Sequence, residues 1–279
     1  MSQGLVAAGV EVLAGPRRLL DGVDATVAPG LVLGVLGANG AGKSTLLRCL
    51  SGGQRLHGGR VELDGRALTA WSAHDLARRR AVMSQEITLA FPFRAAEVVA
   101  MGRDVWRESD RATARVADEM LDLVGMADCA QRIYPTLSGG ERQRVQLARA
   151  LAQIHGGRDP VLLLDEPVSA LDPEHAIRVL ALIRARARAG AAVLVVLHDL
   201  NLAAAFCDQA VFLRAGRRYA AGSVVDLYQP EIIAGVFGIQ ASVVTHPSGG
   251  HPMVIPVYHG CDTVERRPTH ALTSQACCA

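Results

Sequence analysis

The run GANGAGKST at residues 37–45 constrains the fold of this chain more than any other stretch. An apolar run at 31–36 precedes it and a helix-forming stretch at 46–50 follows, so the local order is strand, glycine-rich turn and helix. Glycines let the backbone curl so that its N–H groups point inward at the positive end of the helix, which suits bound phosphate. The candidate phosphate-binding residues are Gly37, Ala38, Asn39, Gly40, Ala41, Gly42, Lys43, Ser44 and Thr45.

The use of lysine singles out the same loop. The chain has 29 lysine and arginine residues, and Lys43 is its only lysine. A compact ammonium on a flexible stem reaches into a phosphate cradle that the broad, planar guanidinium fills poorly. Lys43 is therefore expected to bridge the terminal phosphates of a nucleotide, and the hydroxyl of Ser44 is expected to ligate Mg²⁺.

Length and charge limit the number of domains and the kinds of partner that the chain can have. With 279 residues, 50% of them hydrophobic, the chain can bury one sizeable domain with an inserted lobe or two smaller domains. A net charge of +2 gives no general signal for nucleic acid. Arginine clusters at 78–80 and 184–188 are interpreted as solvated helix faces, because no aromatic residues interleave with them.

The cysteines and the apolar runs indicate the cellular compartment in which the chain folds. The six cysteines show neither a CxxC pair nor metal-ligand spacing, which fits a reducing cytosol better than a disulfide framework or a zinc site. The longest apolar runs, such as 191–197, are far shorter than the roughly twenty residues of a membrane span, and the N-terminus lacks a basic-then-apolar signal pattern. We expect a soluble chain whose membrane role comes through a partner.

The apolar pattern predicts an α/β core with an all-helical insertion. Short antiparallel strands are expected within 1–30, and helical periodicity runs from 95 to about 154. After residue 160, strands alternate with helices, which predicts parallel strands buried on both faces. The remaining predicted strands are 58–65, 81–84, 161–164, 193–197 and 210–213, and the predicted helices are 73–80, 173–188, 200–207 and 227–237.

This pattern predicts two parts of the chain. Residues 1–240 form the α/β domain, with a helical subdomain inserted at about 86–156, and residues 241–279 form an extension with short β segments and a poorly ordered tail. Histidines 246, 251 and 259 are interpreted as turn residues of this extension rather than as heme or metal ligands, and Cys277 and Cys278 as part of the tail.

A second buried strand, VLLLD at 161–165, ends on two carboxylates. Asp165 is expected to hold Mg²⁺ opposite Ser44, directly or through water. Glu166 is expected to face the γ-phosphate and to orient the attacking water; since a carboxylate is a weak base, it accepts the proton late.

Two further side chains are expected at strand ends. His198 ends the strand 193–197, and parallel sheets place ligands at the carboxyl ends of their strands, so a hydrogen bond from His198 to the γ-phosphate is favoured over a purely structural role. Gln85 ends the strand 81–84 and is expected to reach Mg²⁺ and the water.

A second loop-to-helix anion site follows the sequence LSGGE at 137–141, although the chain has one phosphate loop. Its purpose is explained most simply if Ser138, Gly139 and Gly140 close over a nucleotide that another copy of the chain holds.

These motifs together resemble an ATP-binding cassette (ABC) ATPase, across roughly residues 5–240. GANGAGKST resembles the Walker A loop, Gln85 the Q-loop, LSGGE the signature, VLLLDE the Walker B strand, SALD at 169–172 the D-loop and His198 the switch histidine. The resemblance implies a P-loop NTPase fold with a RecA-like parallel sheet, Mg²⁺-dependent ATP hydrolysis, and a head-to-tail dimer that sandwiches two ATP molecules. It also places Asp172 of the D-loop among the nucleotide-site residues.

One motif of the family is missing. The family usually has an adenine-stacking aromatic residue about two dozen residues before the Walker lysine, where this chain has Leu13-Ala14-Gly15-Pro16. The sequence does not identify what stacks on adenine.

A single cassette without a fused membrane span resembles importer subunits that pair with separate permeases. FPF at 91–93 and HDLNLA at 198–203 resemble the branch that imports iron siderophores, cobalamin and heme, and FPF with the ending at 246–256 is most similar to hemin-import ATP-binding proteins. This implies a peripheral subunit on the cytoplasmic face of the bacterial cell membrane, with a permease homodimer, a second copy of itself and, indirectly, a heme-binding protein as partners, and no nucleic acid.

Two other classes of protein fit these motifs less well. Soluble cassette ATPases of DNA repair or translation usually carry long coiled coils or two cassettes in one chain, and a phosphate-loop kinase or GTPase does not explain residues 137–141. A ferric-siderophore or cobalamin importer stays open as the alternative to hemin, because selectivity for the transported molecule lies in other chains.

Overall fold

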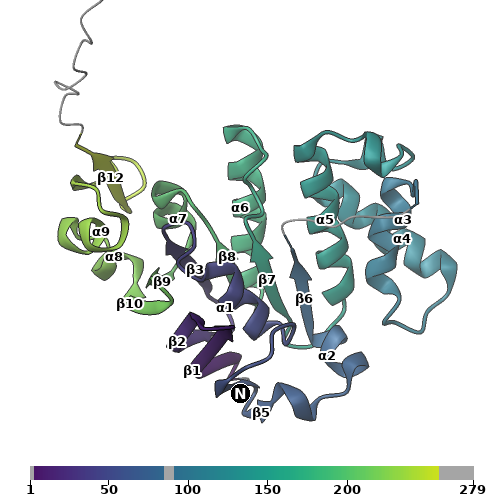
Figure 1. The fold of residues 1–279 in the computed structure, drawn as a ribbon. Helices are drawn as coiled ribbons and strands as arrows, with labels where there is room; N and C mark the ends of the chain where they lie inside the picture. Colours follow the sequence, from purple (N-terminus) through teal and green to yellow (C-terminus); the bar gives the residue numbers. More distant parts are fainter. Residues whose placement is uncertain (1–2, 85–90, 258–279) are drawn as a thin grey trace, which may run out of the picture.

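The computed structural model describes residues 3–84 and 91–257. Gln85, His259 and the predicted tail with Cys277 and Cys278 lie outside the described residues. Within the described part, a six-stranded sheet, a four-stranded sheet, a two-stranded hairpin and the helices around them make up the fold (Figure 1).

The larger sheet carries the candidate site. Its strand order is β10-β9-β3-β8-β7-β6, with all neighbours parallel except the antiparallel pair β9 and β10. Leu162 and Leu164 of β7 pack into one hydrophobic cluster and Val161 and Leu163 into the other, so both faces of the strand are buried as predicted. The strands are β3 (Val32–Gly37), β6 (Arg80–Met83), β7 (Val161–Asp165), β8 (Ala192–Val196), β9 (Gln209–Arg214) and β10 (Arg217–Ser223).

The smaller sheet is antiparallel and has the order β2-β1-β4-β5. Its members are β1 (Leu5–Ala14), β2 (Arg17–Val27), β4 (Gly58–Leu63) and β5 (Arg66–Ala67). The prediction of short strands before residue 30 is wrong in length, since β1 and β2 have 10 and 11 residues. Register shifts along the pair, one of them around Gly9 with its φ of 59°, absorb the irregular spacing of apolar residues as bulges.

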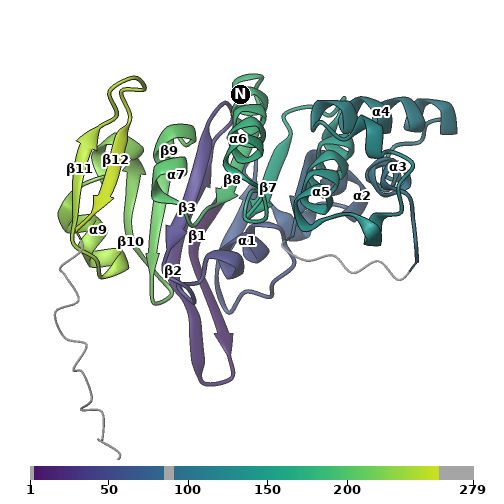
Figure 2. The same cartoon turned by 90° about the horizontal axis from the view of Figure 1, so that it is seen from above.

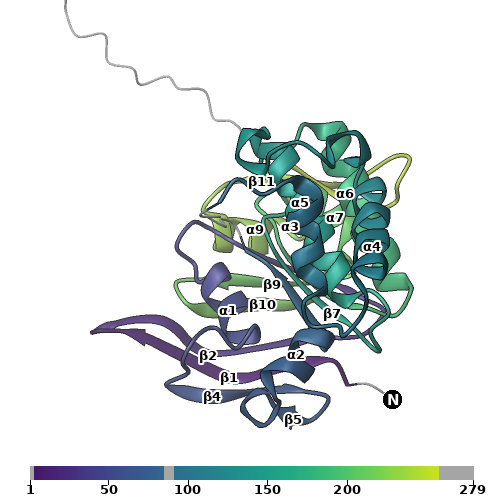
Figure 3. The same cartoon turned by 90° about the vertical axis from the view of Figure 1, so that its right-hand side faces the viewer.

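Helix α1 (Lys43–Leu50) lies between the two sheets, and its buried side chains join the cluster that β1, β2 and one face of the larger sheet share (Figure 3). Helices α6 (Pro173–Arg188) and α7 (Leu200–Phe206) cover the opposite face of the larger sheet. The parallel strand core with antiparallel strands beside it is the predicted α/β architecture, which is confirmed.

The helical segment forms a lobe beside the sheet, next to the edge strand β6 (Figures 1 and 2). Short 3₁₀ turns connect its helices, and α2 precedes them in the chain. The helices are α2 (Ala73–Arg79), α3 (Ala95–Ala100), α4 (Asp110–Leu123) and α5 (Gly139–Ile154), and the 3₁₀ turns within the lobe are Met101–Arg103, Ala127–Cys129 and Tyr134–Thr136.

The interpretation of 78–80 as a solvated face is wrong for two of its arginines. Arg79 pairs with Asp64 at 2.6 Å, and burial lowers the pKa of Arg80 to about 10. Arg78 lies 4.2 Å from the ring centre of Trp106, a tryptophan from a distant segment that the local sequence around 78–80 does not reveal.

The late helix predicted at 227–237 begins later, as α9 (Pro230–Phe237), and a separate short helix that was not predicted, α8 (Val224–Leu227), precedes it. Pro230 has no N–H and disfavours helical backbone at Gln229, which is extended at φ −116° and ψ 143°.

The two strands β11 (Ala241–Thr245) and β12 (Pro252–Pro256) pair as a hairpin beside α7, where the Asn201 amide exchanges hydrogen bonds of 3.2 and 2.7 Å with the backbone of Val254. His246 and His251 flank the hairpin turn with stacked rings. The division of the chain at residue 240 stays a prediction.

Candidate nucleotide-binding site

The carboxyl edge of the larger sheet collects the residues singled out from the sequence. β3, β8 and β7 are neighbours in parallel register, and each ends at this edge. β3 leads into the loop 37–45, β8 leads to His198, and β7 ends on Asp165. Three segments far apart in the sequence thus meet where a parallel sheet binds its ligands.

The loop 37–45 has the curled backbone that its glycines predict. Gly37 has a φ of 151°, and a Cβ atom built on it would lie 2.3 Å from the carbonyl oxygen of Leu213. Ala38, Asn39 and Gly40 form an exposed crest, whereas Ala41 and Thr45 are buried at its base. Close packing at the base therefore fixes the loop, and the crest stays accessible to a ligand.

Lys43 points back into this loop. The residue is only 6% exposed, and its ammonium donates hydrogen bonds of 2.8 Å to the Gly37 carbonyl and 3.1 Å to the Ala38 carbonyl. Burial lowers the pKa of Lys43, against the opposing effect of the Glu166 and Asp165 carboxylates. The ammonium thus lies in a collar formed by these two carbonyls, next to the exposed crest.

Ser44 and Asp165 face each other. The Ser44 hydroxyl donates a hydrogen bond of 3.3 Å to Asp165 Oδ1, and the carboxylate is buried, which raises the pKa of Asp165. A hydroxyl and a carboxylate at this separation are hard oxygen donors of the kind that Mg²⁺ takes in nucleotide sites, so this pair fits the metal.

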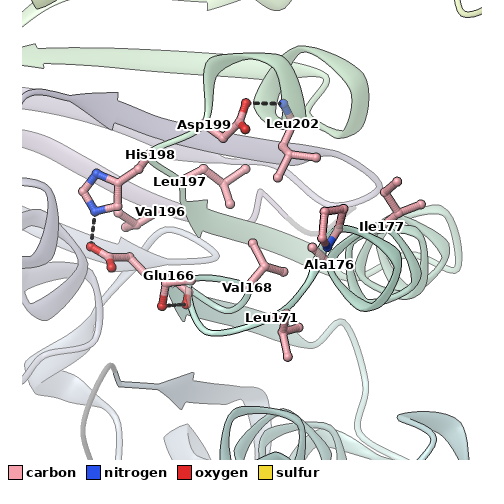
Figure 4. Close-up of a pocket in the computed structure, with 12 residues that line it drawn as sticks. Glu166, Val168, Leu171, Ala176, Ile177, Val196, Leu197, His198, Asp199 and Leu202 are labelled. Atoms are coloured by element: carbon pink, nitrogen blue, oxygen red, sulfur yellow. Dashed lines mark hydrogen bonds and ion pairs between the residues drawn. The ribbon is translucent and has the colours of Figure 1, made fainter. Parts of the chain in front are cut away.

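Glu166 and His198 are brought together at the mouth of the site. The Nε2 atom of His198 contacts Oε1 of Glu166 (Figure 4), although 32 residues separate them. The Glu166 side chain is 12% exposed and that of His198 is 46% exposed. Two residues predicted from separate strand ends therefore form one polar pair that solvent and a ligand can reach.

A cavity of about 330 Å³ opens beside this pair. Its walls are mainly apolar side chains such as Val168, Leu171 and Ile177, and no residue of the loop 37–45 lines it (Figure 4). Phosphate groups need the N–H groups and the ammonium of the loop, so the cavity is not the place that binds them.

The signature residues lie on a different element. Ser138 caps α5, with its hydroxyl accepting from the Glu141 N–H at 3.2 Å, and the Glu141 carboxylate accepts from the Ser138 N–H at 2.7 Å. Within residues 3–84 and 91–257, no hydrogen bond or ion pair joins Ser138, Gly139 or Gly140 to the loop 37–45. The structure of one chain therefore does not assemble all the predicted nucleotide residues into one site.

Asp172 caps α6, and its carboxylate accepts from the His175 N–H at 2.9 Å, which lowers the pKa of Asp172.

Gln143 was not predicted as a site residue, yet its amide bonds to the turn that carries Glu166. Its position five residues after Ser138 is the only sequence signal that could have indicated a role for Gln143 in the site.

Leu13 lies in the region where the family places its adenine-stacking aromatic residue, and it is 37% exposed near the end of β1.

Comparisons with known proteins agree with this geometry. The family model described as ABC transporter matches residues 20–169. The chain is 48% identical to a hemin import ATP-binding protein of Pseudomonas fluorescens, covering 88% of this chain and 97% of that protein, and 48% identical to one of Streptomyces coelicolor, covering 90% and 89%.

Two solved structures are similar over most of their length. A transporter described as of the metal-chelate ABC type, in an inward-facing conformation, has a TM-score of 0.75 and 25% identity, covering 92% of this chain and 98% of its own. A dimeric bacterial ABC transporter cassette has a TM-score of 0.70 and 26% identity, covering 78% and 98%. This chain therefore belongs to the ABC transporter family, as one of its ATP-hydrolysing cassette subunits.

Proposed function

We propose that this ATPase energises the uptake of hemin through a separate transmembrane permease. The observation that supports hemin most is the identity of 48% to hemin import ATP-binding proteins over nearly their full length. None of the helices within residues 3–84 and 91–257 has the length and apolar composition of a membrane span. A separate permease homodimer, with this chain on the cytoplasmic face of the cell membrane, is the partner arrangement that we infer.

The loop 37–45 would bind the phosphates of ATP. Its crest is exposed, so its backbone N–H groups would face the phosphates, and the Lys43 ammonium, held by the Gly37 and Ala38 carbonyls, would reach the terminal phosphates. Ser44 and Asp165 would hold Mg²⁺, and Gln85 stays a predicted third ligand outside the described residues. Bound Mg²⁺ neutralises charge on the phosphate oxygens.

Glu166 and His198 would act at the γ-phosphate end. The Glu166 carboxylate orients the attacking water and accepts its proton late, because an ordinary carboxylate is a weak base. His198 contacts that carboxylate, so it restricts the positions the carboxylate can take. The ring of His198 is half exposed and would also bind the γ-phosphate. The pair therefore combines water positioning with phosphate binding.

The missing wall of the site would come from a second copy of the chain. Ser138, Gly139 and Gly140 make no bond to the loop of their own chain within the described residues. Of the first-turn N–H groups in this part of the chain, those of Gly139 and Gly140 have no hydrogen-bond partner and would be available to an anion. The dimeric cassette to which this chain is similar has also been solved as a dimer with ADP and Pi bound. A head-to-tail dimer would place these residues, with Asp172 nearby, at the partner's nucleotide.

The test is reconstitution with a candidate permease in lipid vesicles. Adding a hemin-loaded binding protein should raise the rate of ATP hydrolysis several-fold, because substrate delivery to an importer is coupled to the ATPase cycle. The apo binding protein is the control and should give little stimulation. Stimulation by a ferric siderophore or cobalamin with its own binding protein, and none by hemin, would contradict the hemin assignment and support the alternative importer.

A further inference from the structure

The turn after β7 holds Glu166 in an unfavourable backbone conformation. Its φ is 51°, in the left-handed region that residues other than glycine rarely adopt. The carbonyl oxygen of Glu166 accepts from the backbone N–H of Ser169 at 3.3 Å and from its hydroxyl at 3.2 Å. Because the turn itself is strained, the position of the Glu166 side chain depends on the groups that hold this backbone.

Gln143 of α5 is the side chain from another element that holds this turn. Its Nε2 donates to the Glu166 carbonyl at 2.6 Å and to the Ser169 hydroxyl at 3.1 Å, and its Oε1 accepts from the Ala170 N–H at 3.1 Å. Both the donor and the acceptor end of the amide are used, so Gln143 clamps the turn at three points.

The first turn of α5 also packs tightly against the same segment. A Cβ atom built on Gly140 would lie 2.8 Å from the Ala170 carbonyl oxygen and 3.0 Å from Leu171 Cδ2. Only glycine allows this approach, which brings the helix close enough for Gln143 to reach the turn. The start of α5 therefore lies in close contact with the segment that follows Glu166.

We propose that Gln143 is a positioning residue that couples the signature residues of a chain to the Glu166 of the same chain. The inference rests on the proposed head-to-tail dimer, in which Ser138 to Gly140 engage the partner's nucleotide while Glu166 acts on the chain's own. Binding at one site then sets the geometry of Glu166 at the other, so the two sites hydrolyse ATP cooperatively.

The alternative is that Gln143 only stabilises the fold, and Gln153 offers a matched control. Gln153 lies on the same helix and donates to the carbonyls of Ala77 and Arg80 at 2.8 and 3.0 Å, away from Glu166. Replacing either glutamine with alanine removes an amide that binds backbone carbonyls. Only Gln143→Ala removes a contact to the Glu166 turn.

The experiment measures ATP hydrolysis against ATP concentration for wild type, Gln143→Ala, Gln143→Glu and Gln153→Ala. We expect Gln143→Ala to lower kcat about 10-fold to 100-fold with little change in KM, since a small misplacement of a catalytic group costs this much, and to bring the Hill coefficient toward unity. Gln143→Glu keeps the acceptor for Ala170 but loses both donors, and should show the same loss. Gln153→Ala should lower the melting temperature alone.

The inference is overturned if either Gln143 variant folds and keeps the kcat and Hill coefficient of wild type. It is also overturned if the Gln153 variant loses both to the same extent, since the effect would then be one of general stability. A wild-type chain that neither hydrolyses ATP nor dimerises with it would instead contradict the proposed function, so the two failures are distinguishable.

Discussion

Replacing Lys43 with arginine is expected to lower ATP hydrolysis at least about 100-fold, the loss typical when one charge-stabilising group is removed from a transition state. The positive charge is kept, but the guanidinium is broad and planar. The collar formed by the Gly37 and Ala38 carbonyls accommodates the compact ammonium of Lys43, a residue that is only 6% exposed. The substitution therefore tests shape rather than charge, and both nucleotide affinity and turnover should fall.

The measurement is ATP binding by titration calorimetry together with steady-state hydrolysis. Arg158→Lys exchanges the same two residue types at a side chain that is 94% exposed, and it should change neither quantity. An unfolded Lys43→Arg chain is recognised by its melting curve. A folded variant with wild-type turnover would show that the single lysine of the chain is not needed for its chemistry.

Replacing Glu166 with glutamine is expected to lower turnover about 1,000-fold while ATP binding is retained, within the range that a positioned general base contributes. Glutamine has nearly the same shape, so the contact with His198 and the backbone of the turn can persist, but the amide cannot accept the proton of the attacking water. Single-turnover hydrolysis of bound ATP measures the effect without product release.

Glu119→Gln is the matched control, since Glu119 is exposed on α4, away from the carboxyl edge of the sheet. It should hydrolyse ATP at the wild-type rate. If Glu166→Gln chains hydrolyse ATP at a rate near that of wild type, another group must activate the water and the role given to Glu166 is wrong.

The sequence predicted the core of the site because its signals are local. The loop 37–45, the carboxylates after β7 and His198 after β8 each follow a short apolar run, and the rule that parallel strands end at one edge brings them together. The α/β fold and the position of α6 follow from the same kind of pattern. These features depend on residues that are neighbours in the chain.

Features that depend on contacts between distant residues were missed. The bonds of Gln143 to the Glu166 turn span 23, 26 and 27 residues, and the stacking of Arg78 on Trp106 joins segments that share no local pattern. The lengths of β1 and β2 were underestimated, because bulges let a strand continue through irregular apolar spacing. The break at Gln229 was present in the sequence as a proline signal that the apolar periodicity outweighed.

The central claim is that one chain holds half of each hydrolytic site and a second copy completes it. The most direct test measures dimerisation by sedimentation in the presence of Mg²⁺ and ATP. It uses two double variants, Glu166→Gln with Lys43→Ala and Glu166→Gln with Ser138→Arg. Neither double variant should dimerise alone, whereas an equimolar mixture should, since it restores one site from an intact loop and an intact signature. A mixture that stays monomeric, or a Ser138→Arg chain that dimerises by itself, would contradict the claim.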